Sequence, residues 1–287
     1  MVVAVVGANG QLGQTLQYIA TDYPGVQFHF FTSNEIDITK KNTIETVWKL
    51  LKPSFCINAA AYTAVDKAET ESNIAQLINV TGTKNLAQVC VAFETTLLHI
   101  STDFVFDGNQ EIPYLETDTT NPQSVYGTTK RNSELAIINT MKTYFIIRTS
   151  WLYSQFGNNF MKTMLRLASQ RNSLSVVDDQ IGSPTHAIDL AKTLLTIVQS
   201  KSKAYGIYHF SNQGNTSWYG FAKKIFEVND VAIQVLPITT SAYPTPAKRP
   251  MYSVLNQSKI KTTFNIPINN WDTALELYAD KIKKGGN

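Results

Sequence analysis

The strongest constraint on the fold of this chain lies in its first thirteen residues, which read Met-Val-Val-Ala-Val-Val-Gly-Ala-Asn-Gly-Gln-Leu-Gly. The apolar run at residues 2–6 predicts a buried parallel strand, and apolar side chains recur at helical spacing from residue 12 to residue 19. Between them stand Gly7, Gly10 and Gly13. Such a turn binds pyrophosphate, because glycine lets the chain bend tightly and the N–H groups at the helix start face the negative charge. A tight turn in any α/β protein is the alternative interpretation.

Composition limits the class of protein. At 287 residues, 43% of them hydrophobic and 16% charged, the chain is typical of a globular protein with a large core in one or two domains. The net charge of +3 is too small to predict a nucleic-acid partner, and the apolar run at residues 2–6 is too short for a signal peptide or a membrane span. We therefore expect neither nucleic acid nor membrane as a partner.

Cysteines and histidines are few. Cys56 and Cys90 fall in a predicted strand and a predicted helix, which indicates a cytoplasmic protein with buried thiols. The four histidines are far apart and lack ligand spacing, so no metal site is predicted.

Strands and helices alternate through the first half of the chain. The predicted strands are residues 2–6, 27–31, 55–58, 97–101 and 144–149. The predicted helices are residues 11–20, 43–51, 71–93 and 127–140. This alternation predicts an α/β fold with a Rossmann-like, doubly wound parallel sheet.

The pattern loosens after residue 150. Strands are predicted at 175–178 and 207–211, and helices at 186–199 and 217–228. We expect a dinucleotide-binding domain at 1–150 and a smaller, sequence-interleaved substrate-binding domain at 151–287, with 207–211 returning to the first sheet. Residues 237–250 contain four prolines and are predicted to be irregular, either as a loop that covers substrate or as an ordinary connection.

The pattern Tyr-x-x-x-Lys occurs twice, at Tyr126–Lys130 and at Tyr219–Lys223. Residues i and i+4 share one face of a helix, so a lysine ammonium near the phenol lowers the tyrosine pKa and makes it a usable proton donor or acceptor. The first pair follows a predicted strand that ends in Thr102 and Asp103. Because strand ends of a doubly wound sheet line the ligand crevice, we expect Thr102 and Tyr126 to reach the same carbonyl oxygen. The second pair is typical of an ordinary amphipathic helix.

The third strand ends in Asn58-Ala-Ala-Ala-Tyr-Thr63. Small side chains at this position let a dinucleotide lie against the backbone, and a well-packed strand end is the alternative interpretation.

Together these residues resemble the extended short-chain dehydrogenase/reductase superfamily and, within it, the dTDP-4-dehydrorhamnose reductase family. The similarity covers residues 1 to about 271, with motifs in both halves of the chain. The motifs that carry it are Val65-Asp-Lys-Ala-Glu69, Ser101-Thr-Asp-Phe-Val-Phe-Asp-Gly108, Arg148-Thr-Ser-Trp151, Gly157-Asn-Asn-Phe160, Asp179-Gln-x-Gly-Ser-Pro-Thr185 and Ser241-Ala-Tyr-Pro-Thr-Pro246.

The resemblance implies reduction of the C4 ketone of dTDP-4-dehydro-L-rhamnose to dTDP-L-rhamnose by NADPH or NADH. It implies that Tyr126 donates the proton, that Lys130 tunes Tyr126 and binds the nicotinamide ribose, and that Thr102 polarises the ketone. Thr102, Asp103 and Tyr126 contact the sugar, and Trp151 packs on the substrate unless it is an ordinary core tryptophan. The implied dinucleotide contacts are Gly7, Gly10, Gln11, Leu12 and Gly13 for the pyrophosphate, Asp37 and Ile38 for the adenine end, and Ala60, Ala61, Tyr62 and Thr63 for the nicotinamide half.

The chain departs from the family pattern at two places. Phe104 stands where the family commonly has tyrosine, which removes any hydrogen bond from that phenol. Some relatives bind magnesium at a dimer contact through a glutamate after the third glycine, whereas this chain has Gln14 there and only Asp189 remains of the acidic partners. A homodimer is possible, but we expect no metal in it.

The cofactor preference depends on the end of the second strand, where an acidic residue would favour NADH. This chain has Thr32, Ser33 and Asn34 there, with neither acid nor arginine, so we expect dual use or a modest NADPH preference. The alternatives for the whole protein are another nucleotide-keto-sugar reductase, an epimerase or dehydratase on the same scaffold, and a non-catalytic dinucleotide-binding regulatory subunit.

Overall fold

A computed structural model describes the backbone of residues 1–284 and the side chains of residues 1–279. Its centre is a six-stranded parallel sheet in the order β10-β5-β4-β3-β1-β2. The strands are β1 (Val2–Val6), β2 (Gln27–Phe31), β3 (Phe55–Asn58), β4 (Thr96–Thr102), β5 (Tyr144–Thr149) and β10 (Gly206–His209). The predicted doubly wound parallel sheet is confirmed, and the segment near 207 does return to it.

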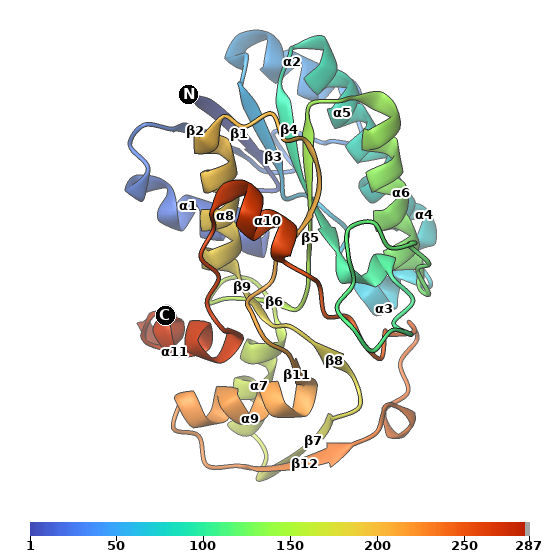
Figure 1. Cartoon of the computed structure of the whole chain (residues 1–287), viewed down its shortest axis with the longest axis vertical. Helices are drawn as coiled ribbons and strands as arrows, with labels where there is room; N and C mark the ends of the chain where they lie inside the picture. The colour runs from blue at the N-terminus through green and yellow to red at the C-terminus, as the bar shows by residue number, and fades with distance from the viewer. Residues whose placement is uncertain (285–287) are drawn as a thin grey trace.

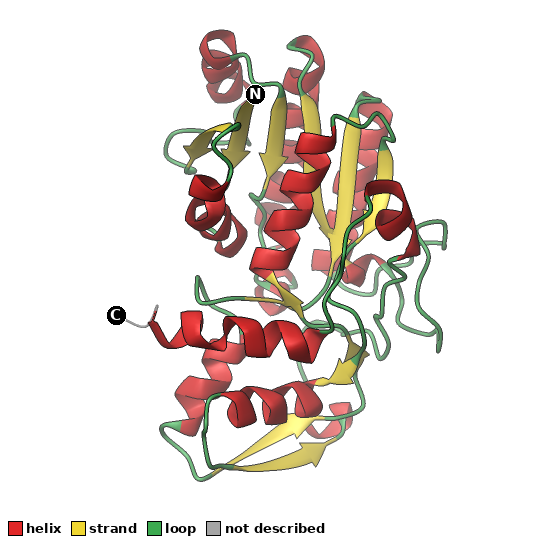
Figure 2. Cartoon of the chain, turned by 60° about the vertical axis from the view of Figure 1, so that its left-hand side comes forward, coloured by secondary structure: helices red, strands yellow, loops and turns green. Residues whose placement is uncertain are grey.

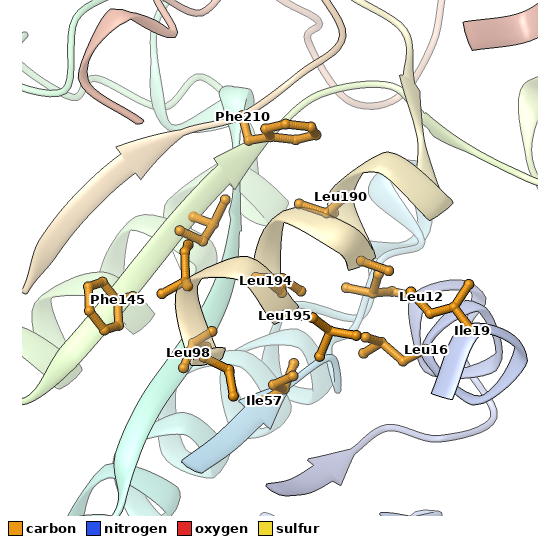
Figure 3. Packing of buried hydrophobic residues seen from close by; sticks show 14 of the residues in the cluster. Leu12, Leu16, Ile19, Ile57, Leu98, Phe145, Leu190, Leu194, Leu195 and Phe210 are labelled. Carbon is orange, nitrogen blue, oxygen red and sulfur yellow. The ribbon is translucent and has the colours of Figure 1, made fainter. Parts of the chain in front are cut away.

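Helices cover both faces of the sheet (Figure 1). One face is packed by α1 (Gln11–Ile19), α8 (Ala187–Ser200) and α10 (Ser258–Phe264), and the other by α2 (Lys41–Leu51), α5 (Thr83–Ala92) and α6 (Val125–Thr140). Figure 3 shows Leu12 and Leu16 of α1 meeting Leu195 of α8. Successive residues of β1 serve opposite cores, which is why this strand is apolar throughout.

The helix predicted at 71–93 is continuous but contains an irregular turn. It consists of α4 (Ser72–Gln76), the π-helical turn η2 (Leu77–Gly82) and α5, after the short helix α3 (Val65–Ala68). The wider turn carries Asn79, which is 1% exposed and points to the loop after β3. Insertions of this kind are common at functional sites.

A second lobe lies below the sheet in Figures 1 and 2. It contains α7 (Phe160–Ala168), α9 (Trp218–Val228), α11 (Trp271–Lys284) and three two-stranded sheets. The pairs are β7 (Ser173–Val177) with β12 (Gln234–Ile238), β8 (Ile181–Gly182) with β11 (Thr216–Ser217), and β6 (Leu152–Tyr153) with β9 (Thr185–His186). An aromatic core around Phe221 and Met161 holds α7 and α9 together. The division of the chain near residue 150 stays a prediction.

The proline-rich segment is more regular than expected. Pro237 lies inside β12, paired with Val176 of β7, and η4 (Thr240–Ala242) is a 3-10 turn. The expectation of irregular structure from residue 237 is therefore wrong at its start. Proline is tolerated because β12 has a partner strand on one side only, so a missing N–H leaves no ladder bond unmade.

Two further features bear on the class of protein. Within the described residues, no helix combines the length and the apolar character needed to span a bilayer. Cys56 and Cys90 are both buried and free, as the sequence predicts.

Candidate active site

The predicted site residues lie at the carboxyl ends of neighbouring strands. The glycine turn follows β1, Asp37 and Ile38 follow β2, and the Asn58-Ala-Ala-Ala segment follows β3. Thr102 ends β4, and α6 carries Tyr126 and Lys130 beside it. Because parallel strands end at one edge of the sheet, this topology gathers residues far apart in sequence at that edge.

The glycine turn is too crowded for larger residues. Gly7 has a φ of +85°, and a Cβ there would lie 2.5 Å from the Ala60 nitrogen. A Cβ at Gly13 would lie 2.3 Å from the Gly7 oxygen. Glycine at these positions lets α1 begin directly against the end of β1 and beside the loop that follows β3.

The start of α1 fits an anionic group. Gly10 is the N-cap residue, no side chain caps this helix end, and its first turn has no acidic residue. The unpaired N–H groups at such an end attract phosphate. Gln11 at the helix start accepts a hydrogen bond from Asn159 at 2.8 Å, and Gly157 packs against it, so the second lobe holds this turn in place. A dinucleotide pyrophosphate therefore fits the residues present.

The segment after β2 differs from the expectation in one respect. Asp37 accepts hydrogen bonds from Thr39, while the Ile38 oxygen accepts one from Asn85 at 3.0 Å. The Glu35 carboxylate turns back and accepts hydrogen bonds from the Thr32 nitrogen and hydroxyl, both at 2.8 Å. Residues 32–34 carry no acid, as the sequence shows, but the fold brings the Glu35 carboxylate beside them, a contact that the sequence did not reveal.

Asn79 connects the loop after β3 to the helix α6. Its side chain accepts from the Tyr62 nitrogen at 2.8 Å and donates to the Tyr62 oxygen and to Thr129. The Tyr62 hydroxyl donates to Glu71 at 2.6 Å. Sequence reasoning missed Asn79, whose only signal was a polar residue within an amphipathic helix. Ala60, Ala61 and Thr63 keep partly or fully exposed surfaces along this loop.

Tyr126 sits in the first turn of α6, and close packing fixes that turn. Ser124 caps it through the Gly127 nitrogen, and Glu69 accepts from the Val125 nitrogen at 2.9 Å. A Cβ at Gly127 would lie 2.3 Å from the Phe104 oxygen, so glycine allows α6 to approach η3 (Asp103–Val105). The Phe104 ring meets the Tyr126 ring edge-on at 5.7 Å. Phe104 thus retains an aromatic contact without a phenol.

The protonation of Tyr126 differs from the sequence expectation. Burial raises the pKa of Tyr126 to about 12, and the Asp103 charge acts in the same direction, while a hydrogen bond with Thr102 opposes both. The predicted lowering of this pKa by Lys130 is therefore wrong in this structure. The Lys130 amine instead donates to the Ile100 oxygen at 2.6 Å and lies 3.2 Å from His99 Nε2.

Lys130 is only 2% exposed. Burial lowers the pKa of Lys130 to about 8, although the Glu134 charge raises it. Glu134 in turn forms a buried bidentate ion pair with Arg148, at 2.9 and 2.7 Å. Desolvation explains the direction of the Lys130 shift, because the charged form loses hydration inside the protein.

Asp103 is a buried carboxyl group beside Tyr126. It is 2% exposed, Oδ1 accepts from the Thr102 hydroxyl at 3.0 Å, and Oδ2 has no hydrogen-bond partner. Burial raises the pKa of Asp103 to about 6. A buried carboxylate oxygen without a partner is suited to accept a hydrogen bond from a ligand hydroxyl group.

Trp151 has a side-chain partner that the sequence did not reveal. It stacks on Trp218 with ring centroids 3.5 Å apart, and a Cβ at Gly182 would lie 2.6 Å from its ring. Its backbone has a φ of +45°, a conformation uncommon for a tryptophan. Trp151 is partly buried, so its predicted substrate contact stays a prediction.

Residues 239–250, here called the strap, run from the second lobe back to Asp66 of α3. At one end Thr240 donates to the Asp179 carboxylate through its nitrogen and its hydroxyl. At the other end Arg249 forms a bidentate ion pair with Asp66, at 3.0 and 2.7 Å. The strap is thus fastened to both lobes of the protein.

The other candidate residues contact groups of the protein itself. Both Asp189 oxygens are occupied, accepting from Tyr278 and Asn212 at 2.7 Å each. Among the side chains that the structure describes, no three His, Cys, Asp or Glu residues are grouped as metal ligands would be. Lys223 lies over the Tyr219 ring on α9 in the second lobe.

Comparison with known proteins gives a consistent result. Residues 1–284 match the family model described as the RmlD substrate binding domain. A dTDP-4-dehydrorhamnose reductase from Aggregatibacter actinomycetemcomitans is 41% identical over 282 residues, covering 95% of this chain and 96% of that protein.

Two solved structures are also similar. A dTDP-4-dehydrorhamnose reductase from Clostridium acetobutylicum has a TM-score of 0.94 and 39% identity, covering 99% of this chain and 100% of that one. A dTDP-4-dehydrorhamnose reductase from Bacillus anthracis, in complex with NADP, has a TM-score of 0.94 and 38% identity, covering 98% and 99%.

Proposed function

This chain belongs to the dTDP-4-dehydrorhamnose reductase family, and we propose that it reduces the C4 ketone of dTDP-4-dehydro-L-rhamnose to dTDP-L-rhamnose with NADPH or NADH. The observation that carries the proposal is the contact between Tyr126 and Thr102 at the sheet edge that also holds the glycine turn. A proton donor therefore lies beside a site suited to a dinucleotide.

Tyr126 acts as the proton donor. Its raised pKa keeps the phenol protonated near neutrality, which suits a group that must deliver a proton to a developing alkoxide. The Thr102 hydroxyl, which donates to Asp103 Oδ1 in this structure, turns its single hydrogen to the ketone oxygen, where such a donor stabilises the charge as it forms. When bound, the reduced dinucleotide supplies the hydride to the ketone carbon.

The remaining residues bind and orient. The glycine turn and the start of α1 hold the pyrophosphate, Asp37 and Ile38 lie at the adenine end, and Ala60 to Thr63 line the nicotinamide half. Lys130 serves the nicotinamide ribose. Asp103 accepts a hydrogen bond from the sugar through Oδ2, and Trp151 bounds the substrate side from the second lobe.

Other functions are less well supported. A regulatory subunit has no need for a proton donor, yet Thr102, Tyr126 and Lys130 are all present here. An epimerase or a dehydratase on this scaffold would return the hydride to its substrate and consume no reduced cofactor. Because the two free cysteines are buried, a cytoplasmic location fits the chain.

The deciding experiment follows NADPH absorbance with purified protein and dTDP-4-dehydro-L-rhamnose generated in place by upstream enzymes. Stoichiometric oxidation of NADPH with formation of dTDP-rhamnose is expected. NADPH binding without turnover would exclude the proposed substrate, and NADPH turnover on a different keto-sugar would reassign it.

A further inference from the structure

A chain of buried polar side chains lies behind the Lys130 amine. Asn58 at the end of β3, His99 of β4 and Ser133 of α6 are each at most 1% exposed, and Lys130 is 2% exposed. The proposed reaction assigns no role to Asn58, His99 or Ser133. Buried polar networks of this kind hold one arrangement when every member is paired.

The orientation of Asn58 follows from its neighbours. The Ala60 nitrogen donates to Asn58 Oδ1 at 3.1 Å, so the amide NH₂ group is the part that faces His99 Nδ1, at 3.0 Å. An amide nitrogen can only donate, so Nδ1 must accept. Burial and the Lys130 charge hold the His99 pKa well below its usual range, which keeps the ring neutral. A neutral ring carries one hydrogen, and here it is on Nε2.

Hydrogen-bond donation continues in the same direction from His99 to Ser133. His99 Nε2 lies 3.0 Å from Ser133 Oγ, and Ser133 donates its own hydrogen to the Lys130 carbonyl oxygen at 2.6 Å. Ser133 Oγ is therefore the acceptor of the His99 N–H. Donation runs in one sense from Asn58 through His99 and Ser133 to the backbone of Lys130.

We propose, on the premise of the reductase function above, that Asn58 and His99 are positioning residues that turn an N–H bond, and not a lone pair, toward the Lys130 amine. An ammonium has three hydrogens to donate. One goes to the Ile100 oxygen at 2.6 Å, and the imidazole cannot take a second although its Nε2 lies only 3.2 Å away. Two hydrogens therefore remain for the cofactor ribose and the Tyr126 side of the crevice.

Several groups around Lys130 act on its charge. Glu134, on the same helix, favours the ammonium, and Arg148 of β5 is paired with Glu134. Burial disfavours the ammonium, and an N–H on His99 Nε2, 3.2 Å from the amine, would act in the same direction. Reversing the His99 tautomer would therefore both capture a Lys130 hydrogen and favour the ammonium.

The test reads the tautomer directly. The ¹⁵N shifts of the imidazole distinguish the two tautomers, and the His99→Gln variant assigns the signal among only four histidines. The wild type is expected to show His99 as the Nε2–H form. Asn58→Asp keeps an acceptor for the Ala60 nitrogen but gives Nδ1 a carboxylate, so the hydrogen should move to Nδ1.

NADPH binding measures the consequence. Asn58→Asp should weaken NADPH binding about tenfold, the equivalent of one hydrogen bond to a charged group. The decline of NADPH affinity at alkaline pH should also begin at a higher pH than in the wild type. Ser133→Ala keeps the donor that faces Nδ1, so its tautomer should persist and its NADPH affinity should stay within about twofold of wild type. His29→Gln replaces a histidine on the edge strand β2, outside this chain of side chains, and is the control for His99→Gln: it should leave the His99 signal and the NADPH affinity unchanged.

Two results would overturn the inference: an Nδ1–H tautomer in the wild type, or a reversed tautomer in Asn58→Asp with unchanged NADPH affinity. The wild-type measurement decides even if Asn58→Asp does not fold. Neither readout needs turnover, so a protein that passes both tests but does not reduce the keto-sugar would refute the proposed function alone.

Discussion

Replacing Asp103 by asparagine should change how the stability of the protein depends on pH. Burial raises the pKa of this carboxyl group from 3.8 to about 6. A carboxyl group whose pKa is raised on folding lowers the free energy of unfolding as pH rises. The loss is complete above the pKa of the folded state, where the carboxylate is charged inside the protein. The penalty is absent well below pH 4 and complete above about pH 7. The full penalty is about 3 kcal/mol, at about 1.36 kcal/mol for each unit by which the pKa is raised.

About half of that penalty develops between pH 5 and pH 8, because the unfolded chain already ionises below pH 5. Urea unfolding at the two pH values should therefore show the wild type losing about 1.5 kcal/mol more than Asp103→Asn as pH rises. Asp22→Asn, at an exposed position, is the control and should follow the wild type. The reasoning fails if the difference between wild type and Asp103→Asn is the same at both pH values.

Four further variants test the site. Tyr126→Phe should lower kcat by at least about 10²-fold with NADPH affinity nearly intact, because only the proton is removed, and equal loss of NADPH affinity in a fluorescence titration would refute that role. Lys130→Ala should lower both kcat and NADPH affinity, and an unchanged affinity would remove its ribose role. Glu35→Gln should shift the ratio of kcat/KM toward NADPH by a few fold, since one exposed negative charge at the proposed adenine end of the site is lost; an unchanged ratio would place that charge outside the cofactor site. Arg249→Ala should raise KM for the keto-sugar severalfold with little change in kcat, because it removes the ion pair that fastens the strap to Asp66 and leaves only the bond from the Ala247 nitrogen; unchanged steady-state kinetics would show that this ion pair does not act on substrate.

The sheet could be predicted from the sequence because its signals are local. The apolar run at 2–6 and the glycines after it specify a strand, a turn and a helix within 20 residues. The sequence also places Thr102, Tyr126 and the glycine turn at one edge, since strand ends converge in any parallel sheet. Pro237 was misjudged because proline forbids only a central strand position, and the position of β12 in its sheet depends on tertiary pairing.

The polar contacts of the site could not be predicted. His99 and Lys130 are separated by 31 residues, and Arg249 and Asp66 by 183. The Tyr126 pKa was predicted in the wrong direction because spacing shows which residue is a neighbour on a helix but not how far both are removed from water. Glu35 was missed for a related reason, since the turn that returns its carboxylate to Thr32 is set by the backbone.

The edge strand β10 has a consequence for how the chain acquires its structure. β5 ends at residue 149, and its outer neighbour begins only at residue 206, after a segment that contains α7, β7 and α8. A nascent chain that stops short of β10 leaves the hydrogen-bonding groups of β5 open on one side, a template for mispairing with other chains. Closing so long an intervening segment costs chain entropy before the new contacts form. We therefore expect the sheet to complete late in synthesis and the segment between β5 and β10 to be tethered to it at both ends.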